Sequence, residues 1–92
     1  MTTATDPVVA ALRAEITALD ARLIETVNAR IKLVAKLRTY KAQNGIAFLD
    51  LDRESALLQQ LKELNGGPLS EDGLQEFLTF VLALVKQELA GE

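Results

Sequence analysis

The stretch VVAALRAEITALDARLIETVNARIKLVAKLRTYKA, residues 8–42, decides the fold. It has no glycine or proline, and its apolar residues recur at the steps of three, four and seven that mark one face of an α-helix. This face carries Leu12, Ile16, Leu19, Leu23, Val27, Val34 and Leu37. At about 1.5 Å per residue such a helix is roughly 50 Å long. A chain of 92 residues cannot cover it, so we expect a helical bundle in which a second copy supplies the missing surface.

A second, shorter helix is predicted over residues 51–64. Asn44-Gly45 marks a turn after the first helix, and Asp50 or Asp52 is a suitable N-cap for the second. The apolar stripe of this helix consists of Leu57, Leu58, Leu61 and Leu64.

A third helix is predicted over residues 71–90. The run Asn65-Gly66-Gly67-Pro68 ends the second helix, and Ser70 is the expected cap of the third. The inward face of the third helix is predicted to carry Leu74, Phe77, Val81 and Leu84. With Asp6 and Pro7 starting the first helix and residues 1–6 expected to fray, the chain is predicted to be one all-α domain, residues 1–92, of a long, a short and a medium helix.

The composition excludes several kinds of chemistry. Without cysteine there is no disulfide or thiol nucleophile, and without histidine the commonest metal ligand and general base is missing, so no metal site is predicted. A net charge of −3 argues against nucleic acid as a partner. No apolar run reaches the roughly 18–20 residues of a membrane span, and residues 1–9 do not resemble a signal peptide. We therefore expect a cytoplasmic protein with no membrane partner.

Four charged residues interrupt the apolar faces: Arg30, Lys41, Glu54 and Glu88. Each could pair with another or extend its charge to solvent, but four charges of both signs favour a shared polar pocket inside the bundle. Arginine and lysine suit carboxylates or phosphates. Because the chain lacks a histidine base and a thiol, we expect a reaction helped by positioning and by placed charge. A unimolecular rearrangement of a small dianion fits this better than a hydrolysis.

The chain resembles the all-helical chorismate mutase family in the placing of its charged residues. The resemblance rests on the segment 12–16 with Leu19-Asp20, on Arg30, on Lys41, and on the segment 50–54, which is similar to the family's D-x-x-R-E motif. The family converts chorismate to prephenate by a Claisen rearrangement on the way to phenylalanine and tyrosine. The resemblance therefore implies an intertwined helical homodimer with two active sites and no cofactor.

The same resemblance assigns roles to the cations. Arg13 would reach a substrate carboxylate from the other protomer, and Arg30 would hold a carboxylate from within the same chain. Lys41 would contact a carboxylate and the ether oxygen of the breaking bond. Arg53 would line the same site.

Asp50 and Glu54 are the residues that the resemblance places at the ring hydroxyl of the substrate. Two carboxylates would also suit the ammonium group of 4-amino-4-deoxychorismate, so a mutase for that substrate is one alternative. An isochorismate pyruvate-lyase on the same fold is another. A non-catalytic helical dimerisation module is the alternative from a different class, but it leaves the charges on the apolar faces unexplained.

The third helix departs from the family pattern. Where members often have a small polar residue and then a glutamine one turn later, an ungapped alignment gives Leu84 and Glu88. A shift of one residue would bring in Ala83 and Gln87 instead. The phase of the predicted apolar face favours Glu88 as the residue at the ether oxygen, with Leu84 lining the site.

Overall fold

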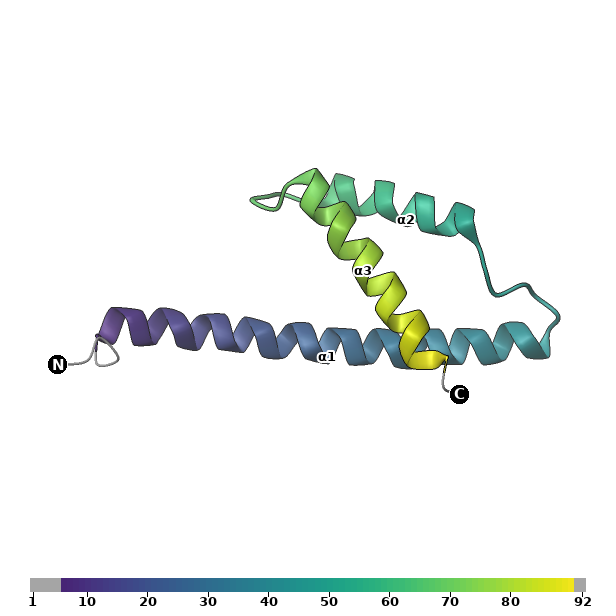
Figure 1. Cartoon of the computed structure of the whole chain (residues 1–92), viewed down its shortest axis with the longest axis horizontal. Coiled ribbons are helices and arrows are strands. Elements are labelled where there is room, and N and C mark those ends of the chain that lie inside the picture. Colours follow the sequence, from purple (N-terminus) through teal and green to yellow (C-terminus); the bar gives the residue numbers. More distant parts are fainter. Residues whose placement is uncertain (1–5, 91–92) are drawn as a thin grey trace. The chain divides into compact units, whose positions relative to one another are not determined.

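Three α-helices make up the computed structural model, which describes residues 6–90 (Figure 1). They are α1 (Pro7–Gln43), α2 (Leu51–Leu64) and α3 (Glu71–Leu89), and no strand occurs among the described residues. The predicted all-α fold with a long, a short and a medium helix is confirmed, and each predicted boundary lies within one residue of the observed one. Of residues 1–6, which were expected to fray, residues 1–5 lie outside the described part of the chain, and Asp6 caps α1.

Each helix begins at a residue whose side chain accepts hydrogen bonds from the first turn. Asp6 Oδ1 accepts from the backbone amides two and three residues later, at 2.9 and 3.0 Å. Asp50 and Ser70 each accept from the amide three residues later, at 2.9 and 3.0 Å. These caps satisfy amides that have no partner within the helix. The caps predicted at Asp6 and Ser70 are confirmed, and of the two candidates for α2 Asp50 is the N-cap and Asp52 is not. Pro7 is the first residue of α1.

The connection between α1 and α2 starts with a tight turn. The Asn44 side chain donates to the carbonyl of Tyr40 at 2.8 Å, and the Ile46 amide donates to the carbonyl of Lys41 at 2.9 Å. Gly45 has a φ of 65°, a conformation that glycine adopts without steric cost. This turn sends the chain away from the last turn of α1 and towards the cap of α2.

The chain divides into two compact units, Met1–Arg30 and Ile31–Glu92. In the first, the described residues are the N-cap Asp6 and α1 up to Arg30, and four apolar side chains of the predicted stripe are about half exposed. These side chains are Leu12, Ile16, Leu19 and Leu23, whereas Val27 of the same stripe is partly buried. None of the 37 residues of α1, all of which the structure describes, is buried.

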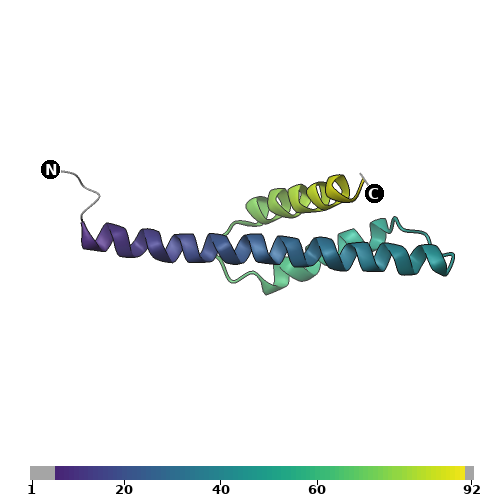
Figure 2. The ribbon, with the colours of Figure 1, turned by 90° about the horizontal axis from the view of Figure 1, so that it is seen from below.

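The core of the second unit lies on α3. Val81, Val85 and Leu89 form a buried cluster, against which Ile31, Val34 and Ala35 of α1 pack. The C-terminal end of α3 therefore lies against the part of α1 that follows Arg30, which can be followed in Figure 1 and from a second side in Figure 2. The buried face of α3 carries Leu74, Leu78, Val81, Val85 and Leu89.

The predicted inward face of α3 is only half correct. Leu74 and Val81 are buried, but the prediction is wrong at Phe77, which is 49 % exposed, and Leu84 is only partly buried. The reason is that α3 is apolar around much of its circumference, so two stripes with helical spacing overlap. In the structure, the buried stripe of α3 is the one that continues from Leu74 through Leu78. The prediction for α2 also fails at its last position, because Leu64 is exposed.

No helix among the described residues is both long enough and apolar enough to cross a membrane.

Candidate active site

Lys41 lies in the last turn of α1, where a cation interacts favourably with the helix dipole. Its side chain is partly buried. The Nζ atom donates a long hydrogen bond of 3.4 Å to the carbonyl of Phe48 and lies 6.0 Å from the centroid of the Phe48 ring. The lysine is thus tied to the segment that leads into α2.

The predicted D-x-x-R-E motif forms the start of α2. Asp50 is its N-cap, and its Oδ1 atom accepts from the backbone amide of Arg53. Arg53 is exposed, whereas Glu54 is partly buried. The acidic side chains of this first turn lie at the positive end of the helix dipole, which stabilises their charge.

Glu54 pairs with a residue that the sequence interpretation did not include. Its Oε1 atom accepts from Lys86 Nζ of α3 at 3.1 Å. Within the single chain, Glu54 therefore pairs with Lys86 and not with another of the four charges on the apolar faces. The side chains of Lys86 and Glu54 are 49 % and 30 % exposed, so water screens this ion pair. An exposed pair of this kind can be exchanged for a substrate contact at little cost in stability.

Arg13 and Arg30 belong to the unit Met1–Arg30, and the other candidate residues belong to Ile31–Glu92. Arg13 is exposed, as is every other residue of the stretch 10–26. Arg30 is partly buried, as its place in the apolar stripe predicts.

The candidate residues of α3 differ in exposure. Leu84 is partly buried, and both Glu88 and Gln87 are exposed. The side chains of Glu88 and Gln87 are therefore both accessible to solvent in the single chain. Leu89, which follows Glu88 directly, is only 2 % exposed.

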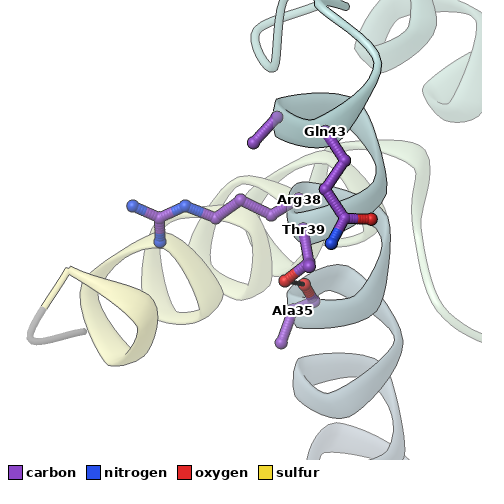
Figure 3. A pocket seen from close by; sticks show the side chains of 5 residues that line it. Ala35, Arg38, Thr39 and Gln43 are labelled. Atoms are coloured by element: carbon purple, nitrogen blue, oxygen red, sulfur yellow. Dashed lines mark hydrogen bonds between the residues drawn. The ribbon is translucent and has the colours of Figure 1, made fainter.

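Arg38 and Phe48 are prominent in this region, although the sequence interpretation did not single them out. The Arg38 side chain extends from α1 towards the last turns of α3 (Figure 3), where its Nη1 atom donates to the carbonyl of Leu89 at 2.9 Å. Arg38 also lines an open hollow of about 460 Å³ together with Ala35, Thr39, Ala42 and Gln43. A signal for Arg38 did exist, because it precedes Lys41 by three residues and so shares its helix face.

Arg38 also lines a second, smaller hollow of about 160 Å³. Its lining consists of Val34, Arg38, Phe48, Lys86, Leu89 and Ala90. The cations of this region are suited to carboxylates, and Glu54 adds an acceptor for a hydroxyl or an amine. Among residues 6–90, no three side chains of the types that bind metals gather in one place.

Comparison with known families decides the assignment. The family model of chorismate mutase type II matches residues 12–88. The chain belongs to the chorismate mutase type II family. No curated protein and no solved structure matches the chain.

Membership of the chorismate mutase family confirms the resemblance inferred from the sequence, and it supports chorismate mutase activity in general. The match begins one residue before Arg13 and ends at Glu88. All eight candidate residues therefore lie inside the part of the chain that the family model describes.

Proposed function

We propose that this protein is a chorismate mutase that rearranges chorismate to prephenate in the biosynthesis of phenylalanine and tyrosine. It acts as a single domain over residues 1–92, without a cofactor. The match to the family model over residues 12–88 carries the proposal, because this range contains every candidate residue from Arg13 to Glu88. The proposal also explains why charges interrupt the apolar faces of all three helices. Action in the cytoplasm stays a prediction from the sequence.

The proposed mechanism uses position and charge. The substrate is held in a compact shape in which the carbon atoms that will bond lie close together. As the new C–C bond forms, the C–O bond of the ether lengthens and negative charge develops on the ether oxygen. Lys41 stabilises this charge, Arg30 holds a substrate carboxylate, and Asp50 and Glu54 bind the ring hydroxyl. Neither a nucleophile nor an external proton is needed.

The exposed stripe of α1 supports a homodimer. Leu12, Ile16, Leu19 and Leu23 are each more than half exposed in the single chain, although their spacing forms one continuous apolar face. A face of this kind is stabilised when a second helix covers it. We propose that the α1 helix of a second copy covers it, and that Arg13 of each chain serves the active site of the other.

The proposal is tested by incubating the purified protein separately with chorismate, 4-amino-4-deoxychorismate and isochorismate. We expect chorismate to be consumed, as measured by the loss of its absorbance, with prephenate as the product. A preference for 4-amino-4-deoxychorismate, or release of pyruvate from isochorismate, would identify one of the two related enzymes. If none of the three is turned over, the protein is a non-catalytic dimerisation module and the proposal is wrong.

Substitution of Glu88 tests the residue proposed at the ether oxygen. The side-chain amide of glutamine can donate a hydrogen bond to this oxygen, whereas alanine offers no donor. We therefore expect Glu88→Gln to be at least as active as the unmodified protein and Glu88→Ala to lose kcat. Gln87→Ala is the matched control. A large loss of kcat in Gln87→Ala, with none in Glu88→Ala, would assign the contact to Gln87.

A further inference from the structure

Arg38 connects three parts of the second unit through one side chain. It starts on α1, its Nη1 atom donates to the carbonyl of Leu89 in α3 at 2.9 Å, and its guanidinium carbon lies 5.7 Å from the centroid of the Phe48 ring. Phe48 belongs to the connection between α1 and α2. The last turns of α3 and the segment before α2 therefore both contact the same residue of α1.

The contact with Phe48 leads to Lys41. Arg38 and Lys41 are three residues apart and share one face of α1, and both cations lie within about 6 Å of the same ring. At this distance the face of an aromatic ring attracts a cation. The Phe48 carbonyl also accepts from Lys41 at 3.4 Å. When Arg38 holds the ring in place, it also fixes the carbonyl that orients the lysine.

The contact with Leu89 leads to Glu88. The last carbonyls of a helix have no partner within the helix, and they attract a cation because the helix dipole is negative at this end. Arg38 supplies both the donor and the positive charge at the carbonyl of Leu89. This carbonyl belongs to the residue directly after Glu88, so the contact sets how the last turn of α3 lies on α1.

We propose that Arg38 is a positioning residue of the active site, which holds Lys41 through Phe48 and holds the end of α3 that carries Glu88. The inference rests on the proposed function, in which Lys41 and Glu88 act at the ether oxygen. Arg38 itself touches no substrate atom. Since the two residues that it holds act on charge that develops in the transition state, loss of Arg38 lowers kcat and leaves KM nearly unchanged.

Three variants test this role. Arg38→Met keeps the length of the apolar side-chain stem and removes the charge and the donor. We expect it to lose roughly 10-fold or more in kcat, because small misplacements of catalytic groups are costly. Arg38→Lys keeps a cation and a donor, and it is expected to recover most of this loss. Phe48→Leu keeps the apolar volume without the ring, and a smaller fall in kcat is expected. Lys32→Met, an exposed cation on the same helix, is the matched control with unchanged kcat.

Backbone amide hydrogen exchange provides a second measurement, which does not need turnover. In Arg38→Met, we expect faster exchange in residues 44–50 and in the last turn of α3, and unchanged exchange in the rest of α2. Unchanged exchange at both places would overturn the inference. An unchanged kcat of Arg38→Met would also overturn it, because this result would assign the role of Arg38 to the packing of its stem. A rise in KM of Arg38→Met without a fall in kcat would overturn it as well.

The two proposals fail in different ways. If the unmodified protein does not turn over chorismate, the proposed function is wrong, and the catalytic part of the role of Arg38 is overturned with it. If the unmodified protein is active while Arg38→Met keeps its kcat, only the inference about Arg38 is wrong.

Discussion

Replacement of Lys41 or Arg30 by alanine is expected to lower kcat/KM by at least about 100- to 1,000-fold, with the fold intact. Lys41 is expected to stabilise the negative charge that develops on the ether oxygen, and Arg30 is expected to hold a substrate carboxylate. Removal of a donor that is aimed at such a charge usually has an effect of this size. Both side chains are only partly buried, so we expect their truncation to leave the fold intact. The decrease in chorismate absorbance with time measures the effect.

Two exposed cations of α1 serve as matched controls. Arg22→Ala controls for Arg30→Ala, and Lys32→Ala controls for Lys41→Ala, because each removes one positive charge from the same helix. All four proteins should have the same circular dichroism spectrum. Near-normal kcat/KM in Arg30→Ala or Lys41→Ala would remove that residue from the active site, and an equal loss in its control would show that only the total charge matters.

A heterodimer of two inactive chains is expected to recover activity, if each active site is built from both chains. One chain carries Arg13→Ala and the other carries Lys41→Ala. Their heterodimer then has one site with both substitutions and one site with neither. We expect it to show about half of the activity of the unmodified dimer, although each variant alone is nearly inactive. The heterodimer is purified through two different affinity tags and assayed with chorismate.

The control for this experiment pairs Arg30→Ala with Lys41→Ala. Both residues are proposed to serve the site of their own chain, so every site of this heterodimer lacks one of them and activity should stay low. Recovery in the control would mean that Arg30 and Lys41 serve different sites. A lack of recovery in the pair with Arg13→Ala would show that Arg13 acts within its own chain.

The local features of the fold could be predicted because their signals are local. The caps at Asp6, Asp50 and Ser70 depend on a side chain and amides two or three residues away, and a glycine at position 45 indicates a turn by itself. The face that α3 turns inward was not predictable in the same way. Phe77 and Leu78 both continue a helical stripe from Leu74, and the packing of the neighbouring helices decides between them.

In the candidate site, too, local features could be predicted from the sequence and contacts between helices could not. The D-x-x-R-E segment could be recognised because it is contiguous and sits on one helix start. The ion pair between Glu54 and Lys86 joins two helices and leaves no spacing in the sequence. The contact of Arg38 with Leu89 spans 51 positions. Such contacts depend on how helices pack, which the apolar pattern alone does not determine.

The small core described above has a consequence for how the protein responds to dilution. The buried side chains of residues 6–90 all lie on α3, and α1 contributes none of them. In the proposed dimer, most of the apolar surface of α1 is therefore covered by the other chain and not by its own. Folding and association are then one equilibrium, and the melting temperature rises with protein concentration. For the proposed dimer, a higher expression level therefore raises the folded fraction of the protein as well as its total amount.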